Sequence, residues 1–199
     1  MKAGVLYAPN TPMVIEDLEY PEPAPGEVLV RIMASGVCHS DWHVVKGEWT
    51  QHPLPTVLGH EGAGVVEAAG AGVTNVKAGD HVVLSWKSSC GVCEMCQNGW
   101  PNVCEQILIP SAKPRISGSD TEINRFAQLG TFSGYALVPE VAAVPIDHDI
   151  PFPQAALVGC GVATGVGAAI NTAGVRPGTT VAVFGAGGVG LNCIQGAAI

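Results

Sequence analysis

Positive charge is scarce in this sequence of 199 residues, which carries 9 lysines and arginines against 17 aspartates and glutamates and a net charge of −8. No run of lysine or arginine occurs, and this argues against nucleic acid as a partner. The N-terminal stretch lacks the long apolar segment and cleavage site of a secretory signal, and no apolar run is long enough to predict a membrane span. We therefore expect a cytoplasmic protein without a membrane partner.

Charged residues of both signs are also few, at 13%, whereas apolar residues make up 47% of the chain. That balance predicts a folded protein with a buried core and argues against disorder. The chain also contains 26 glycines and 15 prolines, which favour strands and turns over long helices. Its length suits one ordinary domain and part of a second.

The chain contains seven cysteines, an odd number in a protein that we expect to be unsecreted. Metal ligands or free thiols are therefore favoured over disulfides. Cys90, Cys93 and Cys96 follow one another at intervals of three, and Cys104 comes eight residues later. Four thiolates complete the tetrahedral shell of a structural zinc. An iron–sulfur site is the alternative that this spacing leaves open.

A second set combines one histidine with two distant cysteines, Cys38, His60 and Cys160. Three such ligands leave the fourth position of a zinc ion open for water or substrate. The segment 59–73 reads GHEGAGVVEAAGAGV. It resembles the zinc signature of the medium-chain zinc-dependent alcohol dehydrogenases, with His60 as ligand and Glu61 behind it. Gly64 and Gly70 stand where glycines of that family stand.

The resemblance gives roles to the polar residues that follow Cys38. By itself the segment could be a polar loop that closes a barrel. In the family, the cysteine at this position binds the catalytic zinc, the hydroxyl matched by Ser40 lies beside the substrate oxygen, and the histidine matched by His43 ends a proton relay. Asp41 matches a carboxylate that orients the zinc-bound imidazole. His39 stands where relatives contact the cofactor pyrophosphate.

The same resemblance extends toward the C-terminal end. Cys160 matches the third zinc ligand, although a buried thiol is its alternative, and Thr164 matches a position that touches the nicotinamide ring. An apolar segment, 180–184, predicts a strand before a G-x-G-x-x-G sequence that opens a helix, which is the context of a dinucleotide-binding loop. We expect that loop to contact the cofactor through Gly185, Gly187, Gly188, Val189 and Gly190.

Aromatic and histidine side chains leave further alternatives. Trp86, and also Trp49, matches a position that lines the family's substrate pocket, with core packing as the alternative. His52 and His81 lie outside the matched ligand positions, so no ligand role is expected for either.

Apolar segments separated by proline and glycine predict strands at 13–18, 27–32, 62–68, 80–85, 130–138 and 142–146, and helices at 153–158 and 163–173. The stretch 105–130 is predicted to run over the surface. The resemblance implies a mainly-β GroES-like catalytic barrel at 1–160 with a zinc lobe at 88–105, joined to the start of an α/β Rossmann domain at 161–199. We expect the chain to be the N-terminal portion of such an enzyme.

The resemblance is strongest to the class III-like branch. It implies a zinc-dependent oxidoreductase that interconverts small alcohols and aldehydes with NAD(P), and a homo-oligomer at full length. Dehydrogenation of a formaldehyde–thiol adduct is the alternative within that branch. A polyol or quinone reductase of the same superfamily is less favoured, because quinone reductases lack the zinc ligands and polyol enzymes often lack the lobe. A zinc-stabilised inactive fragment is the remaining alternative.

Overall fold

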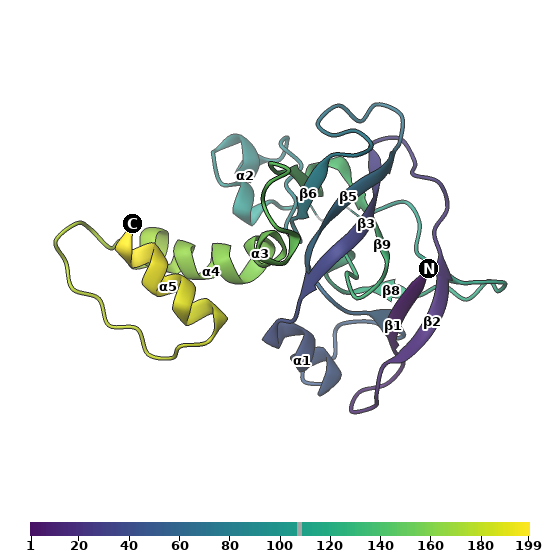
Figure 1. Cartoon of the computed structure of the whole chain (residues 1–199), viewed down its shortest axis with the longest axis horizontal. Coiled ribbons are helices and arrows are strands. Elements are labelled where there is room, and N and C mark those ends of the chain that lie inside the picture. The colour runs from purple at the N-terminus through teal and green to yellow at the C-terminus, as the bar shows by residue number, and fades with distance from the viewer. Residues whose placement is uncertain (107–108) are drawn as a thin grey trace.

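The computed structural model describes residues 1–106 and 109–199, and its strands form two five-stranded sheets (Figure 1). The first sheet has the order β7-β2-β1-β4-β8. Its strands are β1 (Lys2–Leu6), β2 (Val14–Glu19), β4 (Thr56–Val57), β7 (Arg115–Ile116) and β8 (Asn124–Arg125). All of its pairs are antiparallel except β4 with β8.

The second sheet has the order β10-β6-β5-β3-β9 and is antiparallel throughout. Its strands are β3 (Glu27–Gly36), β5 (Glu61–Ala69), β6 (His81–Leu84), β9 (Tyr135–Pro139) and β10 (Ala143–Pro145). The six strands predicted at 13–18, 27–32, 62–68, 80–85, 130–138 and 142–146 each have a counterpart in the two sheets, and β3 continues four residues past the predicted end at Ile32. The short strands β4, β7 and β8 were not predicted. The buried side chains of Ile123 and Phe126 show that the surface course predicted for 105–130 was wrong in its later part. The fold is mainly β with a GroES-like half-barrel, as the resemblance implied.

The long strand β3 holds the second sheet together, because it pairs with β5 on one side and β9 on the other. Its inward side chains Val28 and Val30 are fully buried among apolar residues of the neighbouring strands. Gly64 of β5 lies so close to β3 that a Cβ there would be 2.1 Å from the Arg31 carbonyl oxygen. This close approach explains why a glycine stands inside a strand.

The helices are short and lie mostly at one end of the molecule (Figure 1). The α-helices are α1 (His39–Val45), α2 (Glu94–Gln97), α3 (Phe152–Leu157), α4 (Ala163–Gly167) and α5 (Gly188–Ala198). Three 3₁₀ turns are η1 (Pro101–Val103), η2 (Phe126–Gln128) and η3 (Glu140–Ala142), and two π turns are η4 (Val158–Val162) and η5 (Ala168–Thr172).

The two helices predicted at 153–158 and 163–173 form one continuous helical stretch, Phe152–Thr172, because the π turn η4 joins them. It ends before Gly174, whose φ of +60° is the left-handed conformation that commonly stops a helix. By length and composition alone it could cross a membrane, and 22% of its most apolar window is buried. The expectation that no such run exists was therefore wrong. Core helices of soluble proteins can have the same length and apolar composition, so these two properties are weak support for a membrane span.

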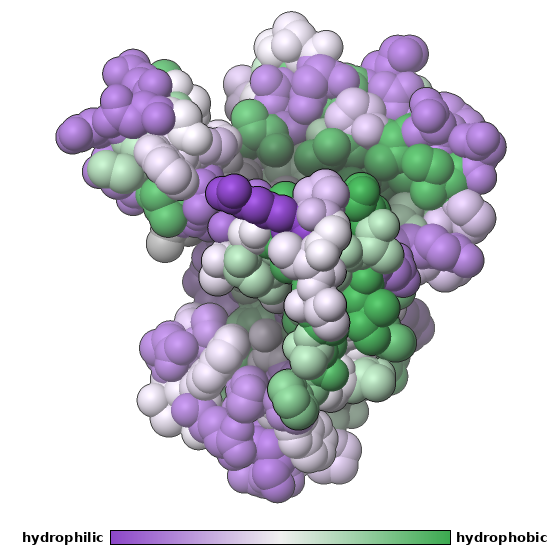
Figure 2. Space-filling view, turned by 90° about the vertical axis from the view of Figure 1, so that its left-hand side faces the viewer, coloured by the Kyte–Doolittle hydropathy of each residue, from purple (hydrophilic) through white to green (hydrophobic). Residues whose placement is uncertain are grey.

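The strand predicted at 180–184 is not formed with any part of the chain that the structure describes. The segment runs beside α5 as an extended loop, and the Phe184 side chain is 98% exposed. Figure 2 views the molecule from this side and shows apolar areas at the surface. The prediction failed because a strand needs a hydrogen-bonded neighbour, and the sheets of the barrel lie elsewhere.

Candidate metal centres and active-site cavity

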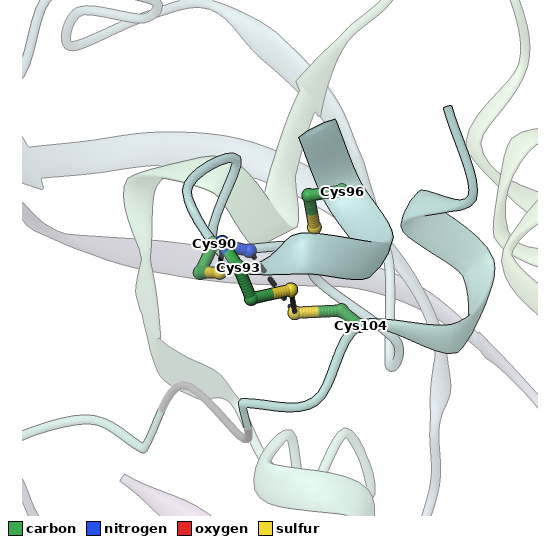
Figure 3. A group of neighbouring side chains, drawn as sticks. All are labelled: Cys90, Cys93, Cys96 and Cys104. Atoms are coloured by element: carbon green, nitrogen blue, oxygen red, sulfur yellow. Dashed lines mark hydrogen bonds between the residues drawn. The ribbon is translucent and has the colours of Figure 1, made fainter. Parts of the chain in front are cut away.

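Four cysteine side chains gather in the lobe around α2 (Figure 3). Their sulfur atoms all lie within 4.8 Å of one another, and the sulfurs of Cys93 and Cys104 are 3.9 Å apart. A tetrahedral zinc with Zn–S bonds of about 2.3 Å separates its sulfurs by about 3.8 Å, so the spacing fits that ion. The lobe therefore contains four thiols that could bind one zinc ion.

Backbone N–H groups donate hydrogen bonds to two of these sulfur atoms. Amide N–H groups of Cys90 and Cys93 donate to the sulfurs of Cys104 and Cys90, each at 3.3 Å. Hydrogen bonding by the backbone of Cys90, and then of Gln106, lowers the pKa of Cys104 to about 6. Burial and the neighbouring thiol of Cys93 raise the pKa of Cys96 to about 12. A bound cation would hold all four as thiolates, because metal ligands bind deprotonated.

The second group joins three segments that are far apart in the sequence. Cys38 caps α1, His60 and Glu61 stand at the start of β5, and Cys160 lies in the π turn η4. One ligand atom of each lies within 4.8 Å of the others. His60 and Glu61 are buried, whereas the two cysteines are partly exposed. This mixture leaves one side of the group open, as a substrate-binding metal requires.

Asp41 contacts the histidine of this group. Its buried carboxylate accepts hydrogen bonds from the backbone N–H of Cys38 at 3.0 Å and of Gly59 at 2.9 Å, and it lies 3.4 Å from His60 Nδ1. That contact leaves His60 Nε2 as the available ligand atom. Burial lowers the pKa of His60, but hydrogen bonds with Asp41 and Cys160 outweigh it and raise the pKa to about 10.

The π turn brings Cys160 to the barrel because glycines flank it. A Cβ at Gly159 would lie 2.6 Å from the Leu84 carbonyl oxygen, so only glycine fits against β6. The backbone N–H of Gly161 donates to Glu61 Oε1 at 3.0 Å. Glu61 thus connects the histidine segment to the cysteine segment and lies within ligand distance itself. π turns of this kind are frequent at functional sites.

A cavity of about 290 Å³ opens beside the group. It is lined by Ser40, Trp49, His52, His60, Trp86, Phe126, Ala127 and Cys160. Ser40 and both predicted tryptophans are therefore present at its wall. His52, Phe126 and Ala127 were not predicted, because 105–130 shows no motif and His52 matches no ligand position. The Phe126 ring meets the His60 ring edge-on at 5.3 Å and the His52 ring at 4.8 Å.

Two of the predicted polar residues lie near this cavity. The Ser40 hydroxyl is 3.6 Å from the Cys38 sulfur. Hydrogen bonds from Ser40 lower the pKa of Cys38, although burial by itself would raise it. His43 follows one turn later on α1 and lies outside the cavity, where its ring stacks on Trp49 at a centroid distance of 5.1 Å.

Most of the predicted cofactor residues are open to solvent. His39 and Thr164 are exposed, as are Gly185, Gly187, Gly188 and Val189. The glycine loop 185–190 is tightly folded, because a Cβ at Gly190 would lie 1.9 Å from the Gly185 carbonyl oxygen. A Cβ at Gly165 would lie 2.5 Å from both the Val189 carbonyl oxygen and the Asn192 Cβ, so the helix that carries Thr164 lies against α5.

Comparison with known proteins agrees with this architecture. Residues 24–148 match the family described as "Alcohol dehydrogenase GroES-like domain". The class-3 alcohol dehydrogenase of Dictyostelium discoideum is 42% identical over 98% of this chain and 54% of its own. An S-(hydroxymethyl)glutathione dehydrogenase of Escherichia coli is 41% identical, with 98% and 55% covered. The chain thus spans about half the length of the curated relatives it matches.

Solved structures give the same result for the fold. An alcohol dehydrogenase zinc-binding domain protein from Burkholderia ambifaria superposes with a TM-score of 0.90 at 38% identity, over 99% of this chain and 55% of that chain. The benzyl alcohol dehydrogenase of Acinetobacter calcoaceticus superposes with a TM-score of 0.86 at 36% identity and the same coverage.

Proposed function

The chain belongs to the alcohol dehydrogenase GroES-like domain family, and from that premise we propose that it provides the catalytic domain of a zinc-dependent oxidoreductase that interconverts alcohols and aldehydes with NAD(P). The convergence of Cys38, His60 and Cys160 at the wall of a cavity is the observation that carries this proposal. An open metal position beside a cavity suits a bound substrate better than a purely structural ion.

We propose that Cys38, His60 and Cys160 hold the catalytic zinc and that Asp41 orients His60. Glu61 lies close enough to approach the same ion, and its tie to Gly161 keeps it there. Cys90, Cys93, Cys96 and Cys104 hold the structural zinc. When bound, the catalytic zinc supplies Lewis acidity that makes an alcohol hydroxyl more acidic, and the nicotinamide is the hydride acceptor.

The protein groups provide the path for the proton. Ser40 Oγ lies at the cavity wall beside Cys38, where it can take the proton of an alcohol and release its own. His43, one turn farther along α1, then transfers a proton to solvent, because an imidazole exchanges protons near neutral pH. The aromatic lining excludes water from the cavity while this transfer occurs.

The cofactor is held by the exposed region near the C-terminal helix. We propose that the backbone of Gly185, Gly187, Gly188, Val189 and Gly190 approaches the pyrophosphate of NAD(P), with His39 on the same group and Thr164 on the nicotinamide ring. The compact loop and its position before α5 support this assignment. The corresponding division is a catalytic domain at 1–160, with its lobe at 88–105, and a nucleotide-binding portion at 161–199.

The cavity favours an uncharged alcohol with an aromatic or aliphatic body. Trp49, Trp86 and Phe126 dominate its wall, and no lysine or arginine is among the described residues that line it. The alternative substrate is the thiol adduct of formaldehyde, which the names of the class III relatives suggest.

We further propose a cytoplasmic homo-oligomer. The seven cysteines are all free, as a reducing compartment would keep them.

The test compares the turnover of two substrates, an aromatic alcohol and the thiol adduct of formaldehyde, by the native protein that carries this sequence. We expect it to oxidise benzyl alcohol with NAD or NADP faster than S-(hydroxymethyl)glutathione. Ser40→Ala should lower turnover about a hundredfold, within the usual range of acid–base catalysis. His43→Ala should cost about tenfold, because solvent partly replaces it. Ser117→Ala, an exposed serine far from the cavity in sequence, is the matched control. Preference for the thiol adduct would select the alternative, and no turnover of either would overturn the proposal.

A further inference from the structure

The His43 ring is held on three sides by its neighbours. Its Nδ1 atom lies 2.5 Å from Glu48 Oε2. The Trp49 ring stacks on it with an interplanar angle of 19°, and the His39 ring meets it edge-on at 4.8 Å. Trp49 also forms part of the cavity wall, so His43 stands directly behind that wall.

The contact with Glu48 determines which nitrogen of His43 carries the proton. An ionised carboxylate only accepts hydrogen bonds, so the ring nitrogen that faces it must be an N–H. A neutral imidazole has one N–H, and placing it on Nδ1 leaves Nε2 with a free lone pair. His39 is the only other titratable group stacked against the ring among the described residues, and it contacts the ring edge-on.

The side-chain pair is not needed to shape the turn between His43 and Trp49. Backbone N–H groups of Glu48 and Trp49 already donate to the His43 carbonyl oxygen, at 2.9 and 3.4 Å. The Gly47 N–H donates to the Val44 carbonyl oxygen at 3.0 Å. The side chains of His43 and Glu48 are 34% and 55% exposed, and exposed pairs contribute little stability. What the pair changes is the orientation and tautomer of the ring.

We propose that Glu48 is a positioning residue that holds His43 as the Nδ1–H tautomer and keeps Nε2 ready to accept a proton from the direction of Ser40. This inference rests on the proposed function, in which His43 ends the proton path. The proton balance is simple: one proton leaves the alcohol through Ser40, arrives at His43 Nε2 and departs from that atom to water or buffer. Glu48 takes no part in the proton transfer itself.

The first experiment uses the 199-residue chain and needs no catalysis. Nitrogen-15 NMR of the imidazoles above neutral pH reports the tautomer of each histidine. We expect His43 to be the Nδ1–H tautomer, and Glu48→Ala to lose that tautomer. Glu22→Ala, an exposed carboxylate with no contact to His43 in the described structure, should leave it unchanged. An Nε2–H tautomer in the unaltered chain, or an unchanged tautomer in Glu48→Ala, would overturn the proposal. If the alanine variant misfolds, Glu48→Met decides, because it keeps the side-chain length without an oxygen acceptor and should also lose the Nδ1–H tautomer.

The second experiment separates positioning from general structure. Glu48→Ala should lower alcohol oxidation by the native protein about fivefold and should cause no further loss in a His43→Ala background. An equal loss in both backgrounds would show that Glu48 acts through the structure and not through His43. If the native protein oxidises no alcohol, the proposed function fails, and the NMR result still decides the tautomer.

Discussion

The surroundings of His60 bury its imidazole and pair one of its ring nitrogens. It is 3% exposed, and an unpaired imidazole in such a place would be costly. Asp41 offsets that cost through Nδ1 and is itself held by two backbone N–H groups. The remaining nitrogen can only face the cysteines, which is the arrangement that a divalent metal needs.

We predict that His60→Ala removes one of the two zinc ions that the two ligand groups can hold. The lobe ion should remain, because its four thiols are independent of β5. Metal analysis of the purified chain measures the stoichiometry, and cobalt substitution identifies the lost site by its spectrum. His148→Ala, which removes an exposed histidine, should retain both ions. Retention of both in His60→Ala would show that His60 is not a ligand.

Gly64 illustrates a residue that the backbone alone requires. We predict that Gly64→Ala lowers the free energy of unfolding by about 2 to 3 kcal/mol, because its Cβ would force β3 and β5 apart at the Arg31 carbonyl. Guanidinium unfolding measures the change. Gly134→Ala is the matched control in the same barrel, since its Cβ would have only ordinary contacts of 3.6 Å and more, and it should cost less than about 1 kcal/mol. Equal losses would contradict this explanation.

Among the elements, the π turn η4 has the largest consequence for the site. A regular α-helix from Phe152 onward would rotate the following residues to other positions on the helix face. The wider turn instead presents Cys160 toward His60 and the Gly161 N–H toward Glu61. α3 anchors the turn, because Ala155 and Ala156 are buried against Ala63 of β5.

The lobe around α2 is an element of a different kind, since few of its side chains are buried. We predict that Cys96→Ser releases the lobe zinc and exposes 88–105 to proteolysis, while turnover per folded molecule of the native protein changes little. Limited proteolysis with mass spectrometry, together with metal analysis, measures both effects. Cys193→Ser is the control, because Cys193 belongs to neither ligand group. Unchanged zinc content in Cys96→Ser would argue against a closed four-thiolate site.

At the scale of the whole molecule, the barrel is well packed, whereas the C-terminal region exposes apolar surface. Phe184 and Ile199 are more than nine-tenths exposed, and Leu191 and Ile194 are about half exposed. α5 packs on α4, but the glycine loop before it is open to solvent and has no sheet beneath it in the described residues. A dinucleotide would meet the loop, the N-terminus of α5 and the exposed side chains of His39 and Thr164.

We therefore predict that the 199-residue chain does not bind NAD with micromolar affinity, because the loop offers the pyrophosphate contact without a pocket for adenine or ribose. Isothermal titration calorimetry of the zinc-loaded chain with NAD is the measurement. Zinc content of the same sample is the control that the barrel is intact. Micromolar binding would show that the loop and α5 are sufficient by themselves.

Residue types and their spacing were enough to predict the kinds of ligand and the local frame that holds them. Thiols and an imidazole are recognisable by type, the lobe cysteines are near one another in the chain, and the glycine loop depends on local backbone conformation. The longer strands of the barrel were also predictable, because alternating or continuous apolar runs such as 27–32 determine their own burial. The two-residue strands β4, β7 and β8 are too short to show such a pattern and were not predicted.

Which distant residues share one cavity depends on how the folded chain packs. Phe126 and His52 line it because β8 and the segment before β4 pack together, and nothing in the local sequence of either encodes that contact. The same reason explains the failures: 180–184 has strand composition but no neighbour to pair with, and the helices on either side of Cys160 join through a π turn whose register depends on contacts with β5 and β6. Pairing and register are properties of the packed chain, and residue type alone does not determine them.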